Sequence, residues 1–149
     1  MSDQKASQVE SRVSLRVVGD ELEPSEVTGL LNLEPDRCHR RGDLVTSRAS
    51  AKRKSGYWSI QSARHVSPKS DVGEHVAWLM QRVGEKSAEL SMFRSKGWIV
   101  DIWVTVFAPE GYGGVTISSD LVRDIAGLAV DLNFSFYGDV EAGEEPASE

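Results

Sequence analysis

Residues 14–43, SLRVVGDELEPSEVTGLLNLEPDRCHRRGD, decide the fold because they place a strand, a short helix and a basic turn in direct succession. At the start of this stretch Val13, Leu15 and Val17 alternate with polar residues. An alternation with a period of two predicts a half-buried strand. The Gly-Asp pair at residues 19–20 is a turn signal that ends the strand. The stretch therefore opens with a strand that has one apolar face.

A short helix is predicted to follow from Pro24. Proline at the first helical position loses no hydrogen bond, because that N–H has no partner within a helix. Val27, Leu30 and Leu31 form one apolar face over about two helical turns. The helix must end before Pro35, since the residue that precedes a proline is pushed out of the α region.

The rest of the chain alternates between strand and helix signals. Asp71 stands where a capping box would begin a helix, and Gly97 where a left-handed residue would end one. Residues 98–107 are apolar on both faces, which predicts a central strand covered on both sides. We expect strands at 37–43, 56–62, 98–107, 115–118 and 130–137, helices at 72–83 and 87–96, and a flexible basic loop at 44–55. We also expect Ser118 or Ser119 to cap a further helix that bears Leu121, Val122, Ile125 and Leu128.

The element order is β-α-β-β-α-β-β-α-β, and its first six elements match the ferredoxin-like split βαβ arrangement. We therefore predict an α+β fold, a ferredoxin-like βαββαβ unit extended by a further β-α-β, with a mainly antiparallel sheet and its helices on one face. Residues 12–138 are expected to form this single domain, between a disordered N-terminal tail (1–11) and a disordered acidic tail (139–149). The side chains expected to point away from the helices are Ser14, Arg16, Tyr57, Ser59, Asp101, Trp103, Thr105, Asn133, Ser135 and Tyr137.

A family resemblance runs through these same elements. The line GDELEPSEVTGLLNLEPDRCHRRGD, from Gly19 to Asp43, resembles the bacterial family catalogued as domain of unknown function 4279. The likeness continues in GYWSIQS, EHVAWLMQRV, KGWIVDIWVTVF and GGVTISSDLVRDIAGLAVDLNFSFYG, and so covers roughly residues 13–138. These stretches contain no catalytic motif, and the resemblance supplies no functional residues. The resemblance implies a small stand-alone bacterial domain of the cytoplasm that acts as a binding or immunity-type protein.

Charge is distributed unevenly along the chain. The net charge is −6, but residues 37–54 carry +6 and residues 138–149 carry −5. A basic block of this kind marks either a polyanion site or a solvated loop. Because the total charge is negative and the run at 52–54 is short, nucleic acid is not an expected partner.

Membrane insertion and secretion are not expected either. The longest apolar stretch, residues 98–108, is about half the length of a membrane span. The N-terminus lacks the basic head and apolar run of a secretory signal. The single cysteine, Cys38, cannot form an internal disulfide, which fits a cytoplasmic location. No metal or cofactor is predicted, because the chain has one cysteine and because His39, His65 and His75 do not stand at metal-ligand spacing in the sequence.

The first candidate site is the basic turn. On an extended segment Arg37, His39 and Arg41 would share one face, where three cations suit a carboxylate or phosphate. Asp43 or Asp20 would then orient His39 as an acid or base. The alternative is that the arginines pair with surface acids and brace the turn.

The second candidate is the sheet face that points away from the helices. Asp101 needs a partner if it is buried, and the ferredoxin-like strand order places Arg16 beside it. Trp103 and Tyr137, with Tyr57, would form a stacking floor for a base, a sugar ring or a peptide. The alternatives are a dimer interface or a lid formed by residues 44–55.

Three functional hypotheses follow from these candidates. The preferred one is a non-enzymatic protein-binding module, in one form an immunity protein, that uses the outward sheet face and the basic turn. The second is a small-anion-binding enzyme or sensor centred on Arg37, His39 and Arg41. The third is a homo-oligomer, such as a homodimer, that buries the aromatic face against its own copy and has no ligand site. No catalytic residue is assigned.

Overall fold

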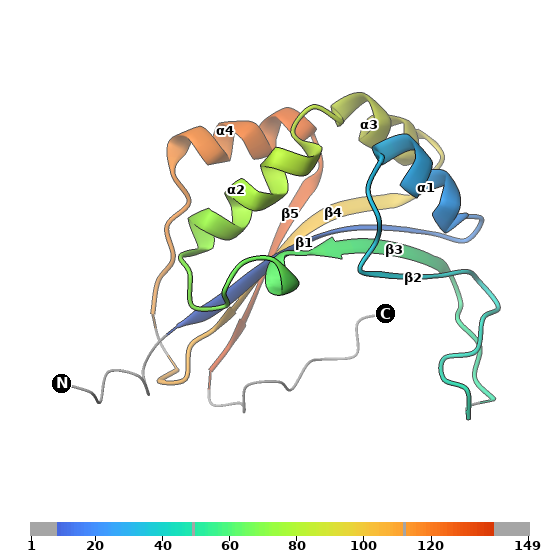
Figure 1. The fold of residues 1–149 in the computed structure, drawn as a ribbon, viewed down its shortest axis with the longest axis horizontal. Helices are drawn as coiled ribbons and strands as arrows, with labels where there is room; N and C mark the ends of the chain where they lie inside the picture. The colour runs from blue at the N-terminus through green and yellow to red at the C-terminus, as the bar shows by residue number, and fades with distance from the viewer. Residues whose placement is uncertain (1–8, 49, 112, 139–149) are drawn as a thin grey trace.

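The computed structural model describes residues 9–48, 50–111 and 113–138, and within them a five-stranded sheet carries four α-helices on one face (Figure 1). The predicted α+β class with a mainly antiparallel sheet is therefore confirmed. In chain order the elements are β1 (Glu10–Gly19), α1 (Pro24–Leu31), β2 (Arg37–His39), β3 (Gly56–Gln61), the 3-10 turn η2 (Ser62–Arg64), α2 (Val72–Val83), α3 (Ser87–Ser95), β4 (Ile99–Phe107), α4 (Ser119–Leu128) and β5 (Asp131–Tyr137).

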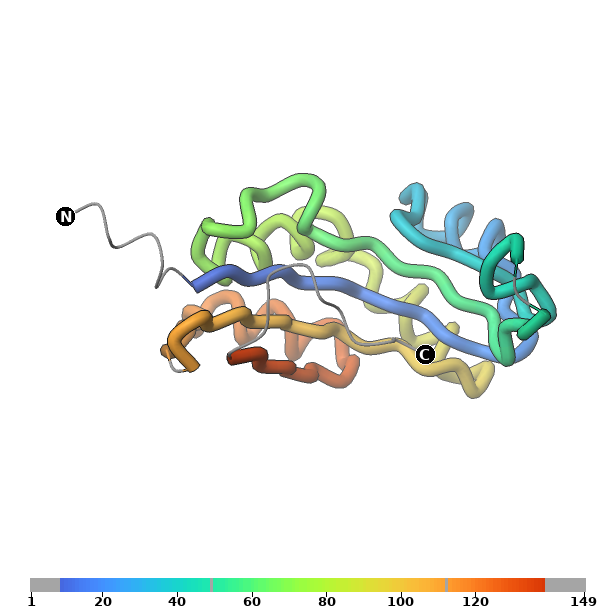
Figure 2. Tube along the Cα trace, turned by 90° about the horizontal axis from the view of Figure 1, so that it is seen from below, coloured from blue at the N-terminus to red at the C-terminus, as the bar shows by residue number. Residues whose placement is uncertain are grey.

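The strands lie in the order β2-β3-β1-β4-β5 (Figure 2). β1 pairs antiparallel with both β3 and β4, and β2 pairs antiparallel with β3. This order is compatible with the ferredoxin-like arrangement of the first four strands. β5 is added beyond β4 and runs parallel to it, and α4 makes the crossover that a parallel pair requires.

The core lies between the helices and the face of the sheet that they cover. Alternate residues of β1 and β4 point toward the helices, so that Val13, Leu15 and Val17 from β1 meet the buried Ile102 and Val104 of β4 in one apolar layer. The helices supply the opposite layer, with Val27, Leu31, Val76, Leu79, Leu90, Phe93, Ile125 and Leu128 all buried. The alternation at Val13, Leu15 and Val17 and the helical spacing of Val27 and Leu31 therefore placed these residues correctly.

Helix α1 forms as the sequence predicts, with Pro24 in its first turn. It ends at Asn32, whose left-handed backbone (φ 57°) turns the chain so that the N–H of Leu33 also bonds the Thr28 carbonyl at 3.3 Å. Leu30, expected on the apolar face, is instead 36% exposed, because the short helix buries only the stripe around Val27 and Leu31.

A buried polar network fixes helix α2 to the sheet. His75 is fully buried, and its Nδ1 lies 2.6 Å from Ser62 Oγ while its Nε2 lies 3.0 Å from the Ser67 carbonyl oxygen. The carbonyl can only accept, so Nε2 carries the proton and Ser62 donates to Nδ1. Ser62 Oγ in turn accepts the Val13 N–H at 2.9 Å. Burial lowers the pKa of His75, which keeps the ring neutral.

Several expected boundaries differ in the structure. The middle strand is β1 and not β4, because β1 holds both of its neighbours by long antiparallel pairings. β1 also begins at Glu10, within the segment expected to be a disordered tail, while residues 1–8 and 139–149 lie outside the described residues. Asp71 is the N-terminal cap residue of α2, but its side chain makes no capping hydrogen bond.

The strand expected at 115–118 is absent from the described residues, which form an irregular connection there. The reason is that β4 already has β1 on one edge and β5 on the other, so a further strand has no partner beside it. Val115 and Ile117 pack against the core instead. Of the two serines expected to cap this helix, Ser118 is the cap of α4 and accepts the Leu121 N–H at 3.3 Å.

The loop expected to be flexible is a hairpin extension of β2 and β3, which we call the basic arm (residues 40–48 and 50–54). Its two sides are joined by backbone hydrogen bonds from Gly42 to Arg53 (2.9 Å), from Arg53 to Asp43 (2.7 Å) and from Val45 to Ala51 (3.0 Å). The arm extends beyond the end of the sheet, next to β2 and β3 (Figure 1).

Candidate functional site

The sheet face opposite the helices is covered by no helix of the described chain, and we call it the outer face (Figure 1). The strand registers place its side chains in rows that run across the sheet. Every side chain that the sequence predicted to point away from the helices lies on it. Its members are Glu10, Arg12, Ser14, Arg16, Val18, Arg37, His39, Tyr57, Ser59, Gln61, Ile99, Asp101, Trp103, Thr105, Phe107, Asp131, Asn133, Ser135 and Tyr137.

At its centre the outer face carries the predicted ion pair of Arg16 with Asp101. The guanidinium binds both carboxylate oxygens, with Nε 2.7 Å from Oδ1 and Nη2 3.1 Å from Oδ2. Asn133 adds a third hydrogen bond to Oδ2 at 3.3 Å. The hydrogen bond to Asp101 raises the pKa of Arg16, against the lowering effect of its partial burial. Asp101 is only 4% exposed, and these three bonds satisfy its buried charge.

Beside this pair lies a row of rings that we call the aromatic strip: Trp103, Phe107 and Tyr137. The Arg16 guanidinium lies 5.5 Å from the Trp103 ring centroid, and that of Arg12 lies 5.6 Å from Phe107. Phe107 and Tyr137 stack at 5.4 Å between centroids. The strip therefore combines rings and guanidinium planes across β1, β4 and β5.

On the other side of Arg16 the face becomes basic. Arg37 and His39 both point outward from β2, and His39 stacks on Tyr57 at 5.4 Å. Ser59 lies in the row between Arg37 and Arg16 and is fully buried. Its Oγ, like Trp103 Nε1, is a buried polar atom with no hydrogen-bond partner within the described residues.

The structure separates the predicted basic cluster into two places. β2 ends at His39, so Arg41 and Asp43 lie in the turn at the base of the basic arm and not on the extended segment. There the Asp43 carboxylate accepts the Arg40 backbone N–H at 2.8 Å. The side chain of Arg40 pairs with Glu23 at 2.7 Å, which lowers the pKa of Glu23 and raises that of Arg40. Arg40 and Asp43 therefore brace the turn.

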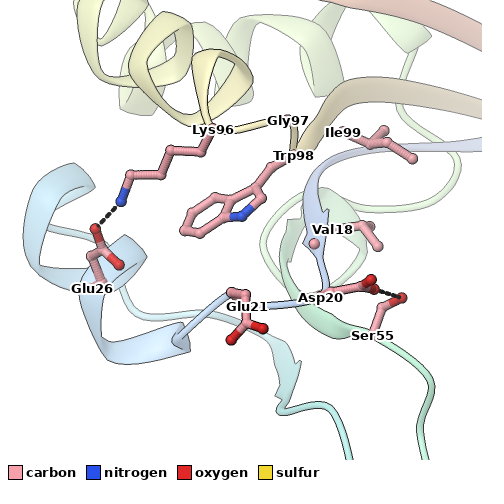
Figure 3. A pocket seen from close by; sticks show the side chains of 10 residues that line it. Val18, Asp20, Glu21, Glu26, Ser55, Lys96, Gly97, Trp98 and Ile99 are labelled. Atoms are coloured by element: carbon pink, nitrogen blue, oxygen red, sulfur yellow. Dashed lines mark hydrogen bonds and ion pairs between the residues drawn. The ribbon is translucent and has the colours of Figure 1, made fainter.

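An open pocket of about 530 Å³ lies at the end of β1 and the start of β4, and no sequence pattern pointed to it (Figure 3). Its floor is the Trp98 indole, which rests on Gly19: a Cβ built on Gly19 would come within 2.3 Å of Trp98 Cδ1. Lys96 lies 4.8 Å from the Trp98 ring centroid and pairs with Glu26. The charge of Lys96 is thus already neutralised by Glu26, which also lines the pocket.

Within residues 9–48, 50–111 and 113–138 there is no group of three His, Cys, Asp or Glu side chains able to hold a metal ion. None of the helices there has both the length and the apolar composition needed to cross a bilayer.

A family model described as Domain of unknown function (DUF4279) matches residues 8–139. The chain belongs to this family. The match confirms the family resemblance of the sequence. No curated protein and no solved structure matches the chain. The DUF4279 match spans all five strands of the sheet, so the outer face belongs to the part of the chain that the family describes.

Sequence reasoning on this DUF4279 domain missed one exposed apolar site. The alternation along β5 placed Leu132, Phe134 and Phe136 on the helix side of the sheet, where the register confirms them. Phe134 and Phe136 are nevertheless 43% and 61% exposed. β5 is an edge strand, and α4 packs toward α2 and α3 and leaves these rings uncovered. Such exposure depends on whether a strand lies at the edge of the sheet. The alternation of apolar and polar residues along the strand does not give that position.

Proposed function

We propose that this domain is a non-enzymatic binding module whose outer face docks another protein. The observation that carries the proposal is that this face, which no helix of the described chain covers, is built around the aromatic strip with Arg12 and Arg16, and has Arg37 at its basic end. Aromatic residues and arginine are the types enriched at protein interfaces and at their energetic centres. A face that only met water would need none of these rings.

The charges of the face favour a protein over a nucleic acid. Arg12, Arg16 and Arg37 are balanced by Glu10, Asp101 and Asp131, so the outer face as a whole is neutral. Nucleic-acid affinity comes chiefly from the neutralisation of phosphates by an excess of cations. A neutral face with a ring-rich centre fits a partner with an apolar patch.

The basic end of the face suggests where that partner is acidic. Arg37 is exposed, and the basic arm begins directly beyond β2. A carboxylate of the partner would meet Arg37 above the unpaired Ser59 hydroxyl. Such contacts at the rim of an interface act on association rate and salt dependence more than on affinity. An immunity-type role is the specific form of this proposal that the family resemblance suggests.

The test is a comparison of two surface variants in affinity capture from the source cell, followed by quantitative cross-linking. Trp103→Ser with Tyr137→Ser removes rings from the outer face, and Leu30→Ser with Val122→Ser removes exposed apolar groups from the helix side. A partner captured by the wild type should be retained by the helix-side variant and lost by the outer-face variant. Circular dichroism must show that both variants are folded. Retention of every partner by the folded outer-face variant would refute the proposal.

The anion-binding alternative has one observation in its favour, the buried Ser59 hydroxyl between Arg37 and Arg16. Asp101 already takes two donors of Arg16, which leaves Arg37 as the cation of such a site. A thermal-shift screen with millimolar phosphates, nucleotides and carboxylic acids checks it, because a ligand that binds the native state raises the melting temperature. A shift that Arg37→Ala abolishes would support the alternative, and the absence of any shift would end it.

A further inference from the structure

The two edges of the sheet are protected to very different degrees. β2, at one edge, is three residues long and carries Arg37, and such short, charged edges resist pairing with other chains. β5, at the other edge, is seven residues long, DLNFSFY, and its only charge is Asp131 at the first position. Within the described residues no strand pairs with its outer side. β5 contains no proline and no lysine, the residues with which proteins usually guard an edge.

The backbone groups that face this open edge belong to the residues with exposed rings. The Tyr137 carbonyl accepts a hydrogen bond from the N–H of Ala108, which follows β4, so Tyr137 directs its backbone toward β4. Backbone direction alternates along a strand, and therefore Leu132, Phe134 and Phe136 direct their N–H and C=O groups toward the open edge. Phe134 and Phe136 also stack on each other at 6.1 Å between centroids.

We propose that β5 pairs antiparallel with β5 of a second copy of this chain, about a two-fold axis at Phe134. In that register Phe134 faces its own symmetry mate and Phe136 faces Leu132 of the other copy. Each of these facing pairs is a hydrogen-bonded pair, which gives roughly six backbone hydrogen bonds between the copies. Asp131 faces Tyr137, so no like charges meet. The strand is complementary to itself in both its backbone groups and its side chains.

The apolar contact is modest in size. The exposed fractions of Phe134 and Phe136 together amount to about one phenylalanine ring surface, ~200 Å² per copy. This apolar area, about 400 Å² over both copies, is well below the roughly 1,200–2,000 Å² of stable complexes, so the pairing relies on its backbone hydrogen bonds as well and should dissociate measurably on dilution. The pairing would join two sheets edge to edge and set their outer faces side by side. This geometry does not depend on the proposed function.

The first measurement is sedimentation equilibrium of the full chain over a concentration series. The mass should rise from 16.4 kDa toward twice that value as concentration increases. Phe136→Lys sets a charge opposite Leu132 and should hold the mass at that of one chain. Leu44→Lys is the matched control, since Leu44 is a similarly exposed residue (50%) in the basic arm, and it should leave the mass series unchanged. A wild type that stays at one-chain mass up to ~1 mM would overturn the proposal, because a specific contact weaker than that is not a stable one.

The second measurement tests the register by disulfide trapping in a Cys38→Ser background, since Cys38 is the chain's single cysteine. The proposed axis sets Asn133 opposite Ser135 of the second copy as a non-hydrogen-bonded pair, with Cα atoms about 4.5 Å apart, within disulfide range. Asn133→Cys mixed with Ser135→Cys should therefore give a linked dimer on mild oxidation. Either variant alone places its cysteines roughly 8 Å apart, beyond disulfide reach, and should stay unlinked.

The pairing of β5 and the docking of another protein on the outer face can be refuted separately in these tests. Equal linking in the mixture and in the separate variants would overturn the register, and no linking would overturn the pairing. Phe136 lies on the helix side of the sheet, so Phe136→Lys leaves the rings of the outer face in place. Loss of the dimer in this variant with retention of a captured partner would separate self-association from the docking of another protein.

Discussion

Removal of the Arg16 side chain should cost this domain far more stability than neutralisation of Asp101. The Asp101 side chain is 6% exposed and that of Arg16 is 24% exposed. Arg16→Met keeps an apolar side chain against Trp103 but leaves a buried carboxylate with the Asn133 amide as its remaining partner. Breaking a buried pair in this way costs about 3–5 kcal/mol of the free energy of unfolding.

Asp101→Asn should lower the free energy of unfolding by less, because Arg16, which loses its charge partner, is partly exposed to water. The amide oxygen still accepts from the guanidinium, and the exposed part of Arg16 becomes hydrated. The expected cost is about 1–2 kcal/mol, the loss of one charge-assisted bond. The double variant Arg16→Met with Asp101→Asn has no buried charge, so it should be more stable than Arg16→Met alone.

Urea denaturation at neutral pH measures all four proteins of this cycle. With an m-value of about 2 kcal/mol per molar, Arg16→Met should lower the midpoint by roughly 1.5–2.5 M, and Asp101→Asn by roughly 0.5–1 M. The decisive quantity is the free energy of unfolding of the double variant relative to that of Arg16→Met. A double variant that is less stable than Arg16→Met would refute the view that a stranded carboxylate dominates the cost.

Three further outcomes are expected. Burial lowers the pKa of His75, so below the ordinary histidine pKa of about 6.5 the unfolded chain binds a proton that the native state does not. The free energy of unfolding therefore falls as the pH is lowered through that range. His75→Gln should reduce the difference between the urea midpoints at pH 7.5 and pH 5.5. Gly19→Ala forces a Cβ against Trp98 and should lose about 1–3 kcal/mol in thermal unfolding, whereas Gly29→Ala, with open space around its Cβ, should gain up to about 1 kcal/mol. Ala129→Gly relieves a left-handed residue (φ 57°) and should raise the melting temperature by a few degrees, about 1 kcal/mol.

The sequence predicted most of the fold because its local patterns and its tertiary structure agree. The alternation at Val13, Leu15 and Val17 matched the buried face of β1, and the proline at residue 24 matched the start of α1. The pairing of Arg16 with Asp101 also followed, because it needs only the strand order and the parity of two strands. Such features depend on near neighbours or on one topological rule.

The errors share a different cause. The strand expected at 115–118 has high β propensity but finds no free edge on β4, and the exposure of Phe136 follows from the edge position of β5. The pocket at Trp98 joins the end of β1 to the start of β4, segments about eighty residues apart in the chain. Each of these depends on where elements lie relative to one another, and a periodicity carries no such information.

The ion pair of Arg16 with Asp101 divides the outer face into two regions with different chemistry. Because Asp101 binds Nε and Nη2 of Arg16, this arginine serves as scaffold and as a stacking plane for Trp103 more than as a cation for a ligand. The cation on the other side is Arg37, on β2, three strands away from Trp103 on β4. With strands about 4.8 Å apart, the aromatic and basic regions are separated by roughly 14 Å. A partner that uses both must therefore present an apolar group and a carboxylate at that spacing, which a globular protein surface can do and a single small anion cannot.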